Sequence, residues 1–103
     1  MHEKELALSL LSHFLERTQI QLDTIVGYIK AEDWENARRD AHTIKGAALT
    51  MSGAELGEAA YCLEKAFKNV DRDEMEAAYL LVKKAFESFK KEAENYILSS
   101  AKE

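Results

Sequence analysis

The chain has 103 residues, the size of one domain, and its 47% hydrophobic and 32% charged residues are typical of a folded, water-soluble protein. A net charge of −5 argues against a protein that follows a nucleic-acid backbone or lies on an anionic membrane. One cysteine excludes an internal disulfide framework and a Cys-rich zinc site. No apolar run approaches the roughly 20 residues that span a bilayer, and no leader pattern opens the chain. We therefore expect a single cytoplasmic domain over residues 1–103, monomeric, either free-standing or excised from a larger protein.

Turn-forming residues are scarce, because proline is absent and glycine occurs four times. A sheet protein of this size would need more of them, so we predict an all-α fold. Residues 1–31 predict a helix with one apolar face, which Leu6 and Leu10 extend toward the N-terminus. The face consists of Leu11, Phe14, Leu15, Leu22, Ile25, Val26 and Ile29. The polar stretch 16–19 allows two alternatives: the helix bends there, or it breaks and gives an extra short N-terminal helix.

The middle of the chain predicts two further helices, over residues 33–51 and 54–70. Asp33 is the expected N-cap of the first. Its buried stripe is predicted to contain Trp34, Ala37, Ala41, Ile44, Ala48 and Met51. Ser52 and Glu55 form a capping-box pattern between the two helices. The stripe of the second is predicted to contain Leu56, Ala60, Leu63, Phe67 and Val70.

A fourth helix is predicted from Asp71 onward, and Glu74 three residues later makes a cap plausible there. Its apolar residues recur at alternating spacings of four and three: Met75, Tyr79, Val82, Phe86, Phe89, Ala93 and Tyr96. Four long helices joined by links of a few residues favour antiparallel neighbours. The predicted architecture is an up-down-up-down four-helix bundle.

The chemistry-bearing residues lie beside the buried stripe of the helix over 33–51. At helical spacing, one face adjacent to that stripe presents Arg38, His42, Lys45, Gly46 and Leu49. A neutral imidazole is a nucleophile, and the two cations one turn to either side would stabilise a phosphate attached to it. A glycine inside a helix costs about 1 kcal/mol relative to alanine, and nothing in the fold demands it. Its missing side chain clears space beside the imidazole for a bulky group or a docking partner.

The short turn between the helices over 33–51 and 54–70 predicts a partner for the histidine. If the two run antiparallel, His42 faces the neighbourhood of Tyr61 to Glu64. Leu63 belongs to the buried stripe, so Glu64 lies one step off it, as His42 does. Its carboxylate would accept the Nδ1 hydrogen and leave Nε2 as the outward nucleophile.

The segment Ala41-His42-Thr43-Ile44-Lys45-Gly46-Ala47-Ala48 resembles the signature of histidine-containing phosphotransfer (HPt) domains of two-component phosphorelays. The resemblance implies that His42 is phosphorylated on its outer nitrogen, that Lys45 stabilises the phosphoryl group and that Gly46 gives access. Leu49 is then part of an exposed docking patch, and Arg38 and Arg39 are candidates for a docking or phosphate role.

Further residues bear on which kind of HPt domain the chain resembles and on the turn that follows the helix over 33–51. The pair Leu63-Glu64 resembles a segment of the phosphotransfer domain of chemotaxis kinases, where a glutamate lies beside the histidine. Tyr61 stands where those domains tend to have a second histidine, which weakens assignment to that subgroup. The usual turn glycine, ten residues after the histidine, is Ser52 here, with Gly53 one residue later.

The resemblance also implies a carrier rather than an enzyme, with no cofactor or metal of its own. Mg²⁺ and the acidic pocket belong to the partner, a response-regulator receiver domain, while a histidine kinase is the other expected partner. His42 would accept a phosphoryl group and pass it to or from a receiver aspartate. Two alternatives stay open: the N-terminal domain of a chemotaxis-type kinase, phosphorylated directly by a catalytic domain, and a four-helix docking module that carries no phosphate.

Overall fold

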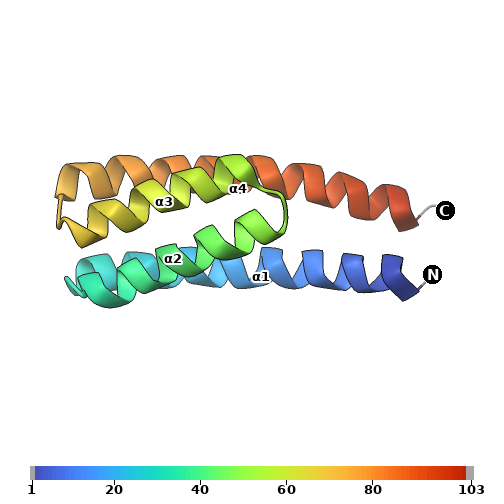
Figure 1. The fold of residues 1–103 in the computed structure, drawn as a ribbon, viewed down its shortest axis with the longest axis horizontal. Helices are drawn as coiled ribbons and strands as arrows, with labels where there is room; N and C mark the ends of the chain where they lie inside the picture. The colour runs from blue at the N-terminus through green and yellow to red at the C-terminus, as the bar shows by residue number, and fades with distance from the viewer. Residues whose placement is uncertain (1, 102–103) are drawn as a thin grey trace.

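A computed structural model of the chain describes residues 2–101 and consists of four helices joined by short turns. These are α1 (His2–Lys30), α2 (Trp34–Thr50), α3 (Ala54–Lys68) and α4 (Arg72–Ala101). Each helix runs antiparallel to the one before it, so the predicted all-α, up-down-up-down bundle is confirmed (Figure 1). Among the described residues, no helix is both long enough and apolar enough to cross a membrane.

The first helix is continuous through residues 16–19, so the extra N-terminal helix left open by the sequence is absent from the described part of the chain. The polar stretch does not interrupt α1, because one of its members faces the core. Thr18 is fully buried and continues the inward line between Phe14 and Leu22. The other residues of the stretch are at least partly accessible and lie on the outer side of the same helix.

The core lies between all four helices and is built from the predicted stripes. Its most deeply buried large side chains are Leu22, Ile25, Ile44, Leu56, Leu63, Phe67, Val82 and Phe86. Trp34 stacks on Phe67 with their ring centroids 6.3 Å apart. The inner face of α2 is mostly alanine, and Ala37, Ala41 and Ala48 are fully buried. Small side chains let α2 approach its neighbours closely, and α2 packs on α3 more extensively than any other pair of helices among the described residues.

Two predicted stripes extend further than the core does. Figure 1 shows α1 and α4 running on past the turn between α2 and α3, so α2 and α3 do not cover this end of the molecule. Leu6, Leu10 and Tyr96 lie on this extension and are more than half exposed, because α2 and α3 do not cover them.

Val70, the last residue of the stripe predicted for the helix over 54–70, is also exposed. The helix α3 ends at Lys68, and Val70 lies in the following turn with φ 49°.

Two of the three predicted caps are confirmed. The Asp33 carboxylate accepts a hydrogen bond from the backbone N–H of Asn36, and the Asp71 carboxylate accepts one from the N–H of Glu74. Both satisfy a donor that the first turn of a helix leaves free.

The capping box predicted at Ser52 and Glu55 is wrong. The N-cap of α3 is Gly53, which has no side chain to bond, and Ser52 adopts a left-handed conformation with φ 61°. The turn closes through the backbone instead, since the N–H of Gly53 donates to the carbonyl of Ala48 at 2.7 Å. A Cβ at Gly53 would lie 3.2 Å from the Phe89 ring. A side chain at position 53 would therefore require the Phe89 ring to shift by a few tenths of an ångström. Ser52 takes the left-handed position that helix ends more often give to glycine.

We expect Asp33→Ala to lower the free energy of unfolding by about 1 kcal/mol, because it removes the side-chain cap of α2. Urea unfolding followed by circular dichroism measures the change. Ser52→Ala is the matched control at the α2–α3 turn. It should change the free energy of unfolding by less than about 0.5 kcal/mol, since its hydroxyl caps no helix. A loss of about 1 kcal/mol at Ser52 would restore the capping box and contradict this turn.

Candidate functional site

Helices α2 and α3 bring together a histidine, a carboxylate and a lysine. The contact expected from the hairpin register is present, with His42 Nδ1 2.9 Å from Glu64 Oε2. The other carboxylate oxygen, Oε1, lies 3.1 Å from Lys45 Nζ. The side chain of His42 is 61% exposed, whereas those of Lys45 and Glu64 are only 25% and 15% exposed. The carboxylate of Glu64 is thus largely shielded from solvent and contacts both other side chains, whereas the imidazole of His42 faces solvent.

The Glu64 contact determines which ring nitrogen of His42 can react. An ionised carboxylate only accepts hydrogen bonds, so Nδ1 carries the hydrogen and donates it to Glu64. In the neutral imidazole the lone pair is then on Nε2, the nitrogen that Glu64 does not hold. A histidine whose ring orientation and tautomer are set by a third group has the arrangement of an oriented nucleophile.

Opposing effects act on the ionisation of Glu64. Its desolvation between the two helices raises its pKa, but the interactions with Lys45 and with His42 lower it. The lowering effects prevail together, so the pKa of Glu64 lies below its ordinary value. The carboxylate is therefore ionised at neutral pH and remains an acceptor for both partners.

The surface of α2 next to His42 is open. Gly46 is exposed, and a Cβ built there would meet nothing within 4 Å, so packing within the chain does not require a glycine at this position. The space left free lies one turn after the imidazole. Leu49, one turn further on, is 57% exposed. The surface of α2 beside the imidazole therefore has no side chain at Gly46 and an exposed apolar side chain at Leu49.

Sequence reasoning missed Gly57, which supports Leu49 from the facing helix. A Cβ at Gly57 would lie 2.9 Å from Leu49 Cδ2, closer than carbon atoms pack, so the leucine rests on the bare backbone of α3. A glycine inside a run of good helix formers was the available signal. The role of Gly57 can be interpreted only once it is known that Leu49 of α2 lies against it.

Sequence reasoning placed Tyr61 in the segment that faces His42 but gave its side chain no role in the site. The Lys45 ammonium lies 5.2 Å from the centroid of its ring, and Lys65 Nζ lies 5.5 Å from the same centroid. The signal was its position three residues before Glu64, on the same face of α3.

The two arginines stand apart from the carboxylate cluster. Arg38 Nη2 lies 3.9 Å from Glu35 in the preceding turn, and the Arg39 side chain is exposed. Both lie within about one turn of His42. They border the site rather than forming part of it.

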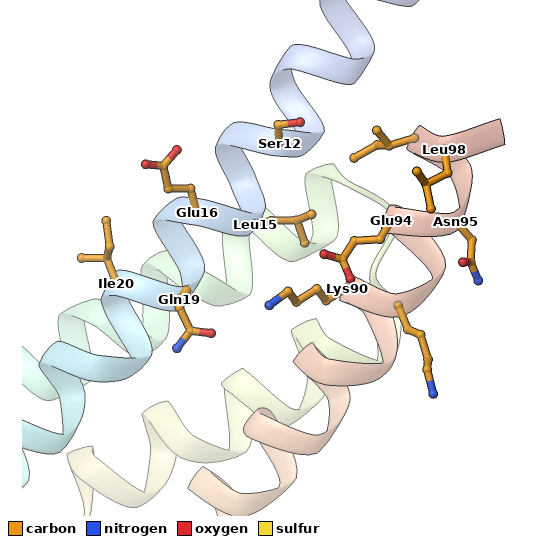
Figure 2. A pocket seen from close by; sticks show the side chains of 11 residues that line it. Ser12, Leu15, Glu16, Gln19, Ile20, Lys90, Glu94, Asn95 and Leu98 are labelled. Atoms are coloured by element: carbon orange, nitrogen blue, oxygen red, sulfur yellow. The ribbon is translucent and has the colours of Figure 1, made fainter. Parts of the chain in front are cut away.

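A groove between α1 and α4 lies on helices other than those that carry His42 and Glu64. Figure 2 shows Leu15 pointing from α1 toward α4, with Glu94 and Leu98 on the opposite wall. Ile20 and Lys90 also line it. None of the residues that line this groove belongs to the cluster of His42, Lys45 and Glu64.

The family model of the Hpt domain matches residues 9–97 of the chain. The matched span begins within α1, ends within α4 and contains the whole His42, Lys45 and Glu64 cluster. Neither the comparison with curated proteins nor that with solved structures gave a match.

We expect the stabilising effect of Glu64 to depend on pH. Because the folded-state pKa of Glu64 is lowered, its contribution is present above the ordinary glutamate value of 4.5 and is lost as the pH falls through the lowered pKa. Glu64→Gln should therefore be less stable than the wild type at pH 7, and this difference should shrink at pH 3. Urea unfolding at both pH values measures it.

Glu58→Gln is the control, since Glu58 is an exposed carboxylate on the same helix. It should show neither the loss at pH 7 nor the change with pH that Glu64→Gln shows. An equal difference between wild type and Glu64→Gln at both pH values would mean that the charge of Glu64 does not stabilise the fold.

Proposed function

The chain belongs to the Hpt domain family, whose members carry phosphoryl groups in two-component phosphorelays, and we propose that His42 is its phosphoacceptor. The observation that carries the proposal is the hydrogen bond between His42 Nδ1 and Glu64. It leaves Nε2 as the nucleophilic nitrogen of a ring that is 61% exposed. An accessible, oriented imidazole is what a carrier needs when a second protein brings the phosphoryl group.

The proposed donor is the aspartyl phosphate of a receiver domain. The lone pair of Nε2 attacks phosphorus, the bond from phosphorus to the aspartyl oxygen breaks, and the aspartate leaves as a carboxylate. The phosphorylated ring retains its Nδ1 hydrogen, and the adjacent Glu64 carboxylate stabilises the positive charge that the ring gains. The reverse reaction passes the phosphoryl group to another receiver aspartate.

Lys45 and Gly46 have complementary roles in this proposal. The Lys45 ammonium is held at the carboxylate that bonds the imidazole, so its positive charge lies near the phosphoryl group. Gly46 leaves space over α2, where a side chain would approach the incoming group. Neither residue takes or gives a proton in the transfer.

The partner supplies the catalysis. Mg²⁺ and the acidic pocket are assigned to the receiver, and this chain contributes the nucleophile and its positioning residues. Leu49 is more than half exposed and provides an apolar docking contact next to Gly46. Arg38 and Arg39 lie toward the other end of α2 and are proposed to meet acidic groups at the rim of the receiver's active site.

We expect His42→Gln to abolish phosphorylation by a phosphorylated receiver with Mg²⁺, while the helical circular-dichroism signal is retained. The lost group is the nucleophile itself, so no acid-labile, alkali-stable label should form. His13→Gln is the matched control, because His13 is an exposed histidine on α1. It should be labelled like the wild type.

Label that persists on His42→Gln would place the phosphoacceptor elsewhere. Label from the catalytic domain of a histidine kinase, but from none of several receivers, would favour the directly phosphorylated domain of a chemotaxis-type kinase. A folded wild type that accepts label from neither source would be a docking module.

We expect Gly46→Gln to fold normally and to accept phosphate from a receiver about tenfold more slowly or worse, because a side chain there obstructs the approach to Nε2. Gly27→Gln is a close control. Gly27 also lies inside a helix and is exposed, and a Cβ there also meets nothing within 4 Å. It should gain similar helix stability and transfer at the wild-type rate. Equal transfer rates for the two variants would remove the argument for clearance at Gly46.

A further inference from the structure

We infer that Tyr61 is a positioning residue that holds the Lys45 ammonium beside Glu64 and His42. The inference rests on the proposed role of His42 as phosphoacceptor. It adds Tyr61 to the site as a residue that positions Lys45. Its basis is the placement of the lysine, whose Nζ lies 3.1 Å from a Glu64 oxygen and 5.2 Å from the centre of the Tyr61 ring.

A lysine at this position needs more than one contact to stay in place. Its four-carbon stem has many rotamers, and ordering it costs conformational entropy. Glu64 alone is a weak tether, because its other oxygen accepts the hydrogen bond from His42 and one carboxylate charge is shared between two partners. The face of an aromatic ring attracts a cation through its quadrupole at distances up to about 6 Å. Tyr61 supplies that second attraction from the helix that also carries Glu64.

The spacing on α3 explains why the two contacts act together. Tyr61 and Glu64 are three residues apart, so they stack on one face of the helix and border the same stretch of α2. Lys45 reaches across from α2 and is only 25% exposed between them. With the ring removed, the ammonium can leave Glu64 for solvent. The carboxylate charge beside His42 would then be less well balanced when a phosphoryl group arrives.

Lys65 provides an internal control for this interpretation. Its Nζ lies 5.5 Å from the same ring centroid, four residues further along α3. Its side chain is exposed, and its ring contact arises within one helix rather than across the site. A variant at Lys65 therefore removes a cation from the ring without removing the charge that Glu64 holds.

The experiment uses phosphoramidate, a small donor that needs no docking surface. Nε2 of His42 attacks its phosphorus, the phosphorus–nitrogen bond breaks, and ammonia leaves. We expect Tyr61→Leu to slow this reaction about two- to fivefold, the effect of a partly exposed cation–π contact. Tyr61→Phe keeps the ring and should react at the wild-type rate, as should Lys65→Ala.

A double-mutant cycle separates positioning from a structural effect. In the Lys45→Ala background, Tyr61→Leu should have no further effect on the rate, because the residue it positions is gone. A slowing that persists without Lys45, or a slow Tyr61→Phe variant, would overturn the inference. So would a Tyr61→Leu variant as fast as the wild type.

A second measurement does not depend on phosphorylation. Limited acetylation with an N-hydroxysuccinimide ester, read by peptide mass spectrometry, reports how freely the Lys45 amine reacts. We expect Tyr61→Leu to raise the acetylation of Lys45 at least twofold and Tyr61→Phe to leave it unchanged; no rise in Tyr61→Leu overturns the inference. Failure of the wild type to be phosphorylated at His42 would instead refute the proposed function, so the two failures are distinguishable.

Discussion

The close packing of α2 against α3 is the constraint on which the site depends. The inner face of α2 is fully buried at Ala37, Ala41 and Ala48, so the two helix backbones approach closely. At the turn, Gly53 admits the Phe89 ring, and on α3 Gly57 admits Leu49. A larger residue at Ala37, Ala41 or Ala48 would force the two helices apart, and the distance of 2.9 Å between His42 and Glu64 would then not be kept.

The three side chains of the site differ in how far they are exposed to solvent. Glu64 lies deepest, Lys45 is intermediate, and His42 is the most exposed of the three. Burial strengthens the electrostatic contacts of the carboxylate, and the two partners on α2 offset its desolvation. The imidazole of His42 remains at the surface, where a second protein could reach it. A rigid helix pair therefore provides both a fixed tautomer and an open approach.

The same bundle leaves a different surface where α1 and α4 continue alone. Past the α2–α3 turn, apolar residues such as Leu6, Leu10 and Leu98 remain exposed. The groove between these helices lies on elements that carry none of His42, Lys45 and Glu64. The groove and the His42 cluster therefore occupy separate helices of the bundle (Figure 1).

The sequence by itself determined the features that repeat along a helix or depend on a few neighbouring residues. The four helices, the core stripes, the caps at Asp33 and Asp71 and the alignment of His42 with Glu64 all follow from period, residue type and one short turn. Three features could be seen only in the folded chain: the exposure of Leu6 and Tyr96, the tight space at Gly53 beside the Phe89 ring, and the contact of Tyr61 with Lys45. The physical reason is that each of these depends on a distance between helices, and helical periodicity specifies a direction around one axis but not what lies opposite it.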